Sequence, residues 1–171
     1  MAKETRTPAA RNYFLEPGSI FLADRSAVIS TVLGSSVSVC LFDRKRNVGG
    51  MNHFSYPLTL KKEEATACYG NVATLALIRM MYQDGSEGAH LEAQIFGGAY
   101  NEKISSKDIG QENYQMARKL LARERIPVVS EDVGGKKGRK IVFNTGTNEI
   151  AVMKVENLRR SDWYPYEQDQ R

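Results

Sequence analysis

The chain has 171 residues, of which 42% are hydrophobic and 26% are charged, a composition typical of one soluble globular domain. No apolar run approaches the roughly 18 to 20 residues that a membrane-spanning helix needs, and residues 1–12 lack the apolar core of a signal peptide, so we expect a cytoplasmic protein without direct membrane insertion. The net charge of +4 favours encounter with acidic partners but does not by itself indicate nucleic-acid binding.

The densest basic cluster follows two glycines and contains Lys136, Lys137, Arg139 and Lys140. We interpret it as a solvated hairpin turn and not as a phosphate or RNA patch, because no aromatic side chains alternate with it to stack on bases. The sequence therefore predicts no nucleic-acid partner.

The two cysteines, Cys40 and Cys68, stand among apolar or small residues and are expected to be buried thiols without a disulfide. Together with His53 and His90 they show none of the short paired spacings typical of a zinc site. We therefore expect neither a metal nor another cofactor.

The first half of the chain reads as strands joined by turns. Residues 1–16 are predicted to be a flexible leader, and Pro17-Gly18 marks the turn that follows it. Period-two alternation and turn signals then predict four strands, over residues 20–23, 28–32, 36–42 and 48–55.

The second half adds two helices to the strands. Apolar periodicity predicts helices over residues 71–83 and 108–124, with a strand over residues 91–96 between them. Strands over 126–132, 140–144 and 149–155 are expected to finish the sheet as a meander. We predict one domain over residues 17–156 with a mixed, mostly antiparallel α/β sandwich fold and two main helices. Residues 157–171 form a polar tail whose aromatic residues can fold it back.

The chemistry of the chain is most visible where a small-residue turn, Gly34-Ser35, places Ser36 at the start of a strand. The neighbouring strand brings His53, and this arrangement is typical of a nucleophile paired with its base. Ser36 alone would most often be an ordinary strand serine, and His53 alone a satisfied core residue. The two together favour the functional interpretation.

The chain resembles the CheD family of chemoreceptor glutamine deamidases. The matching segments occur in order from about residue 16 to residue 155: Thr31-Val32-Leu33-Gly34-Ser35-Ser36-Val37, Gly49-Gly50-Met51-Asn52-His53-Phe54, Ile95-Phe96-Gly97-Gly98-Ala99, Ile109-Gly110-Gln111-Glu112-Asn113, and Glu131-Asp132-Val133-Gly134-Gly135 with Arg139. The resemblance implies a three-layer α/β sandwich and the conversion of glutamine side chains of chemoreceptor cytoplasmic helices to glutamate.

The resemblance also implies roles for individual residues. The nucleophilic cysteine of the family's Leu-Gly-Ser-Cys-Val motif falls on Ser36, and the histidine base falls on His53. A threonine that orients the histidine falls on Ser30, or on Thr31 if the register slips by one residue. The implied partners are chemoreceptor cytoplasmic domains and the CheC-type phosphatase with which family members associate.

Ser36 leaves the activity open, because a hydroxyl is far harder to ionise than a thiol and needs concerted proton removal. Three explanations compete: an engineered knock-out, a natural variant with slow activity, and a natural pseudoenzyme kept for binding. The alternative to a deamidase is therefore a catalytically weak or inactive module that contacts receptors or a CheC-type phosphatase.

Overall fold

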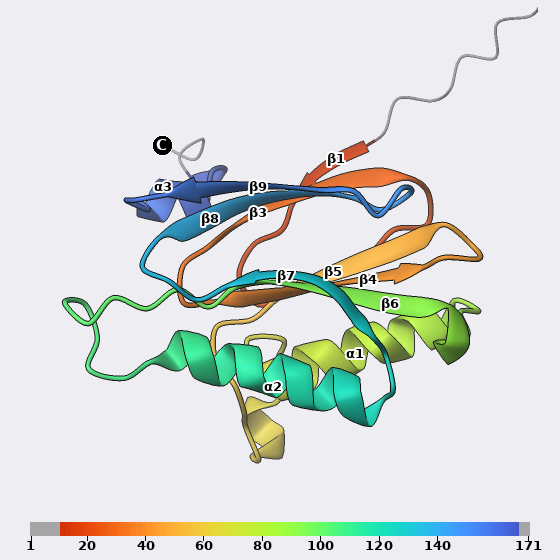
Figure 1. Cartoon of the computed structure of the whole chain (residues 1–171), viewed down its shortest axis with the longest axis horizontal. Coiled ribbons are helices and arrows are strands. Elements are labelled where there is room, and N and C mark those ends of the chain that lie inside the picture. Colours follow the sequence, from red (N-terminus) through yellow and green to blue (C-terminus); the bar gives the residue numbers. More distant parts are fainter. Residues whose placement is uncertain (1–10, 168–171) are drawn as a thin grey trace, which may run out of the picture.

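The structure is a computed structural model that describes residues 11–167 and has three layers (Figure 1). A four-stranded sheet forms one outer layer, a five-stranded sheet lies in the middle, and two long helices cover the other face of the five-stranded sheet. This arrangement confirms the predicted α/β sandwich with two main helices.

The middle sheet has the strand order β2-β5-β4-β6-β7. Its neighbours are antiparallel except for β6 and β7, which run parallel because α2 connects them. Its strands are β2 (Ser19–Leu22), β4 (Val37–Asp43), β5 (Val48–His53), β6 (Leu91–Gly97) and β7 (Val128–Val133).

The outer sheet has the strand order β1-β3-β8-β9, in which only β1 and β3 run parallel. Its strands are β1 (Arg11–Phe14), β3 (Ala27–Leu33), β8 (Gly138–Asn144) and β9 (Ile150–Val155). The turn from β3 to β4 passes from one sheet to the other, so it brings residues of both sheets together.

The main helices are α1 (Gly70–Gln83) and α2 (Ile109–Arg123). The side chain of Asp108 caps α2 by accepting a hydrogen bond of 2.9 Å from the backbone N–H of Gln111. Three short helices complete the described part of the chain: η1 (Lys62–Glu64), η2 (Gly88–His90) and α3 (Arg160–Trp163). No helix within residues 11–167 is both long and apolar enough to cross a membrane.

Strand β4 divides the core in two because its side chains alternate between the faces of the middle sheet. Val37, Val39 and Leu41 face the helices, where they pack against Leu77 and neighbouring apolar side chains. Cys40 faces the outer sheet, in a second cluster that includes Met51, Phe96 and Phe143. The alternation predicted for this strand is therefore confirmed.

Two predicted details of the topology are wrong. Residues 126–132 do not begin a meander, because β7 lies in the middle sheet beside β6, while β8 and β9 form a hairpin in the outer sheet. Residues 11–14, expected within the leader, form β1 beside β3, whereas residues 1–10 lie outside the described residues. In the expected tail, α3 contacts β3, and residues 168–171 lie outside the described residues.

Candidate active site

Ser36 lies at the end of the turn between β3 and β4, where backbone contacts hold it in place. Its carbonyl oxygen accepts a hydrogen bond of 2.9 Å from the N–H of Gly98. A Cβ atom on Gly97 (φ +108°) would collide with the same carbonyl oxygen, so this position needs a glycine. Ser36 as a whole residue is buried, with 7% of its surface exposed. The turn therefore holds Ser36 in a fixed position where it still lines a surface hollow.

His53 is the last residue of β5 and is fully buried. Its Nε2 atom lies 3.0 Å from Oγ of Ser36, within hydrogen-bond distance. Its backbone carbonyl accepts a hydrogen bond of 2.8 Å from the N–H of Gly18, which fixes the end of the strand. The expected nucleophile and base are thus brought together by the middle sheet and the turn that leads into it.

Thr31 completes the arrangement from the outer sheet. Its Oγ1 atom lies 2.9 Å from Nδ1 of His53, on the other side of the imidazole ring from Ser36. The Thr31 hydroxyl donates its single proton to the carbonyl oxygen of Leu15, so it can only accept from His53. This assigns the proton of neutral His53 to Nδ1 and leaves Nε2 free to accept the proton of Ser36.

Ser30, the other expected partner of His53, lies on the opposite face of β3, because successive strand residues alternate. Its hydroxyl donates instead to the carbonyl oxygen of Tyr13 at 3.4 Å. The structure therefore brings Ser36, His53 and Thr31 together and leaves Ser30 outside the group.

Burial decides the protonation state of His53. Removal from water lowers its pKa from 6.5 to about 4, although the carbonyl of Leu15 works in the opposite direction. The imidazole is consequently neutral at pH 7 and is a proton acceptor of low basicity. The hydrogen-bonded chain from Ser36 through His53 to Thr31 can move a proton away from the hydroxyl as that hydroxyl attacks an electrophile.

The side chain of Asn113 on α2 fixes the β3–β4 turn by hydrogen bonds. Its Nδ2 atom donates at 3.0 Å to the carbonyl of Ser35 and at 3.0 Å to the carbonyl of Ser55, tying the turn to the end of the β5 segment. Asn113 belongs to one of the segments that carry the family resemblance, but the sequence does not show which groups its amide contacts. No sequence signal marks the carbonyl of Leu15. Both groups act through contacts between residues distant in sequence.

A hollow of about 240 Å³ lies above the nucleophile. Its lining comes from four segments: the turn before β2, the β3–β4 turn, the residues just after β5, and the C-terminal segment. The lining residues are Pro17, Gly34, Ser35, Ser36, Ser55, Trp163 and Tyr164. A side chain of a substrate can reach Ser36 through this hollow, while His53 and Thr31 remain buried behind it.

The two cysteines take no part in this arrangement. Cys40 is buried between the sheets, where removal from water raises the pKa of its thiol. Cys68 is free and half-buried. Within the described range 11–167, no three His, Cys, Asp or Glu side chains gather closely enough to hold a metal ion.

The basic cluster at residues 136–140 differs from the solvated turn that was expected, because Arg139 is buried with 2% exposure. Its Nε donates to Oδ1 of Asp132 at 2.8 Å, and its other nitrogens reach the carbonyls of Gly134 and Lys137. Burial alone would raise the pKa of Asp132, but the hydrogen bond and charge of Arg139, together with Lys154, lower it below its ordinary value. Arg139 therefore fastens the loop after β7.

Comparisons with known proteins agree with the resemblance seen in the sequence. The family model described as CheD chemotactic sensory transduction matches residues 57–154. A protein of Trichlorobacter lovleyi named probable chemoreceptor glutamine deamidase CheD is 41% identical over 154 residues, which cover 89% of this chain and 95% of that protein. A protein of the same name from Sulfurimonas denitrificans is 36% identical over 146 residues, covering 84% and 94%.

A third relative, named probable chemoreceptor glutamine deamidase CheD 1, comes from Anaeromyxobacter dehalogenans and is 43% identical over 133 residues, or 77% of each chain. The family model begins after His53, so its match does not depend on the candidate active site. By the family model and by these relatives alike, the chain belongs to the CheD family.

Proposed function

We propose that this chain acts on chemoreceptor cytoplasmic helices as a glutamine deamidase, with Ser36 in the position of the nucleophile. The observation that carries the proposal is the hydrogen-bonded chain Ser36–His53–Thr31 at the base of a solvent-accessible hollow. The relatives supply the substrate class, since each is named a probable chemoreceptor glutamine deamidase. The activity would be that of a hydrolase on side-chain amides.

The reaction would begin when Oγ of Ser36 attacks the side-chain amide carbon of glutamine. Nε2 of His53 takes the hydroxyl proton as the C–O bond forms, and the carbonyl oxygen becomes an oxyanion. The protonated imidazole then gives that proton to the amide nitrogen, which leaves as ammonia as the C–N bond breaks. An ester of Ser36 remains, and His53 is neutral again.

Water would complete the reaction by the same route in reverse. Neutral His53 takes a proton from water as the water oxygen attacks the ester carbon. The C–O bond to Ser36 breaks, His53 returns the proton to Oγ, and glutamate is released. Oγ1 of Thr31 accepts the hydrogen bond of the Nδ1–H group throughout and keeps the ring in the productive orientation.

The developing oxyanion needs hydrogen-bond donors, and the β3–β4 turn offers two candidates. Among the hydrogen bonds between described residues, neither Ser35 nor Ser36 donates its backbone N–H. A pair of such amides beside a nucleophile is a common way to stabilise an oxyanion. We assign this role to the amides of Ser35 and Ser36.

The energetics favour slow turnover for the serine form. His53 has a pKa of about 4 and so accepts a proton weakly, and its partner Thr31 is an uncharged hydroxyl. Serine hydrolases support their histidine with a buried carboxylate, which stabilises the imidazolium better. A thiol at this position would ionise far more readily, so we expect the Ser36→Cys protein to be faster by several powers of ten.

Mass spectrometry of a purified receptor cytoplasmic fragment tests this proposal. The fragment is incubated with the chain as it stands, with Ser36→Cys and with Ser36→Ala as the matched inactive control. We expect a gain of about one dalton at particular glutamines, fastest with the thiolate of Ser36→Cys and absent with Ser36→Ala. Activity of Ser36→Cys that persists after a second change, His53→Gln, would contradict the assigned base.

The competing function is binding without catalysis, to receptors or to a CheC-type phosphatase. The serine at position 36, where the resemblance places a cysteine, is the observation that favours it. The same experiment separates the two functions. If Ser36→Cys leaves every glutamine unchanged while the fragment still binds, the deamidase proposal fails and the binding function takes its place.

A further inference from the structure

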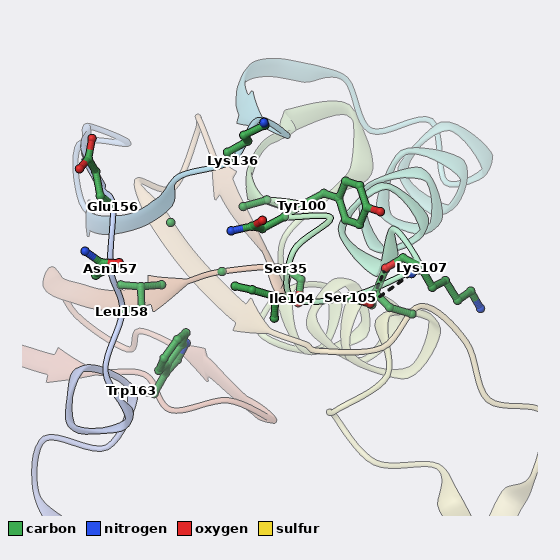
Figure 2. A pocket seen from close by; sticks show the side chains of 15 residues that line it. Ser35, Tyr100, Ile104, Ser105, Lys107, Lys136, Glu156, Asn157, Leu158 and Trp163 are labelled. Atoms are coloured by element: carbon green, nitrogen blue, oxygen red, sulfur yellow. Dashed lines mark hydrogen bonds between the residues drawn. The ribbon is translucent and has the colours of Figure 1, made fainter.

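Figure 2 shows a second hollow, of about 380 Å³. The two hollows share Gly34, Ser35 and Trp163 as lining residues. The loop from residue 99 to residue 107 forms one side of the larger hollow, and the C-terminal segment with Leu158 and Trp163 forms the other. A substrate group that occupied it would therefore be next to the glutamine that reaches Ser36.

The C-terminal segment is held firmly against the active-site turn. A Cβ atom on Gly34 would lie 3.5 Å from Cζ2 of Trp163, which places the indole ring against the backbone of that glycine. Leu158 packs on Gly138 so closely that a Cβ there would collide with it. The backbone N–H of Arg159 donates at 2.6 Å to Asp162, which closes the first turn of α3. Trp163 is thus a fixed wall between the hollows.

The lining of the larger hollow suits an apolar side chain. Ala99, Ile104, Leu158 and Trp163 contribute apolar surface. Ile104 is 83% exposed, so its apolar surface is available for a contact. Of the three charged residues that line the hollow, Lys107 pairs with Glu112 at 3.2 Å and Glu156 pairs with Lys137 at 3.1 Å, while no ion pair between described residues includes Lys136.

We propose that this hollow is a subsite for an apolar side chain of the receptor helix, one helical turn away from the target glutamine, and that Ile104 and Trp163 determine this specificity. The inference rests on the proposed deamidase function. Residues three or four apart on a helix have Cβ atoms roughly 5–6 Å apart, so they can occupy two adjoining hollows at once.

Substrate preference tests the subsite. In the Ser36→Cys protein, the ratio of kcat/KM is measured between receptor fragments that carry leucine and fragments that carry serine at each position three or four residues from the glutamine. We expect leucine to be preferred roughly tenfold at one of these positions, as for other apolar pockets. Adding Ile104→Ser should bring the ratio close to one, because the variant removes apolar surface from the lining of the larger hollow.

The matched control is Leu60→Ser, since Leu60 is 88% exposed and lines neither hollow. It should leave the preference unchanged. Trp163→Ala should abolish the preference, and Trp163→Phe should restore most of it by keeping an aromatic wall. If the Ile104→Ser and Trp163→Ala proteins still prefer leucine as strongly as the Ser36→Cys protein does, the inference is overturned and the deamidase function stays intact.

Fluorescence gives an independent readout, because Trp163 is the only tryptophan in the chain. A receptor fragment without tryptophan, added to the Ser36→Ala protein, should change the emission of Trp163 in a saturable way. Binding seen by calorimetry without any change in emission would overturn the inference alone. A fragment that neither binds nor is deamidated by Ser36→Cys would overturn the proposed function and the subsite together.

Discussion

Thr31 and His53 face one another across the gap between the two sheets, with 2.9 Å between the threonine Oγ1 and the histidine Nδ1. The contact has a defined direction, because the threonine proton is already donated to Leu15. A residue of the outer sheet thereby sets the tautomer of a histidine in the middle sheet. The orientation of the candidate base consequently depends on how the two sheets pack.

Replacing Thr31 tests this dependence. In the Ser36→Cys protein, Thr31→Val should lower kcat/KM for deamidation by roughly a hundredfold, because His53 loses the acceptor that orients it. Thr31→Ser keeps a hydroxyl and should retain most of the activity.

Ser30→Ala is the matched control, since Ser30 lies on the other face of β3. It should change neither the activity nor the rate at which iodoacetamide modifies the introduced thiol. A loss of activity in Ser30→Ala equal to that in Thr31→Val would contradict the assignment of Thr31.

The pH dependence of stability should reveal the buried histidine. The folded-state pKa of about 4 lies below the ordinary value of 6.5, so as the pH falls below 6.5 the unfolded chain takes up a proton that the folded chain does not. Since a pKa unit corresponds to about 1.4 kcal/mol, His53 should lower the free energy of unfolding by about 2 kcal/mol between pH 7 and pH 5. Urea denaturation at the two pH values measures this change, and His53→Gln should reduce it. If the free energy of unfolding of His53→Gln still falls by the same amount between pH 7 and pH 5, the attribution to His53 is wrong.

Gly97 should be far less replaceable than Gly134, although both have positive φ. In Gly97→Ala the new methyl group meets the carbonyl oxygen of Ser36, so we expect a loss of at least roughly 3 kcal/mol in the free energy of unfolding. Gly134 (φ +74°) has nothing within 4 Å of a Cβ, so Gly134→Ala should cost only about 1 kcal/mol of backbone strain. Denaturation curves of both variants measure these losses in the free energy of unfolding. Equal losses would exclude the collision with Ser36 as the reason that Gly97 is needed.

The ion pair between Arg139 and Asp132 should matter more than its position in a glycine-rich loop suggests. Asp132→Asn leaves a cation with 2% exposure without its counter-charge and should cost about 3 kcal/mol. Lys154→Ala removes a half-exposed partner of the same carboxylate and should cost at most about 1 kcal/mol. Thermal denaturation measures the loss of stability in the Asp132→Asn and Lys154→Ala proteins. A larger loss in Lys154→Ala would contradict the importance assigned to the ion pair between Arg139 and Asp132.

Local patterns in the sequence carry most of the secondary structure but not the pairing of strands. The alternation in β4 and the apolar periodicity of α1 and α2 follow from which side chains each element buries. The alternation of residues 126–132 is equally compatible with a hairpin and with a parallel neighbour, because it says nothing about which strand lies alongside. Strand β1 escaped prediction because its four residues mix polar and aromatic side chains without a regular apolar face.

The candidate site shows the same limit at the level of single residues. Ser36 and His53 could be predicted from the turn and the spacing around them, but Ser30 and Thr31 could not be separated. Both carry hydroxyls, and each has apolar residues two positions away on its own face of β3. The alternation therefore does not reveal which face meets His53. The contact partners of Asn113 and Arg139 lie on other elements, where only the folded chain brings them together.

The carbonyl of Leu15 places a requirement on any shortened version of this protein. A truncation that begins at Pro17 would keep Ser36, His53 and Thr31 but would discard the group that receives the threonine proton. The freed hydroxyl could then rotate and donate toward Nδ1, which would favour the opposite tautomer of the imidazole and place a hydrogen atom between His53 and its nucleophile. The candidate site therefore needs the backbone of Leu15, which directly follows β1, even though the side chain of this residue takes no part in it.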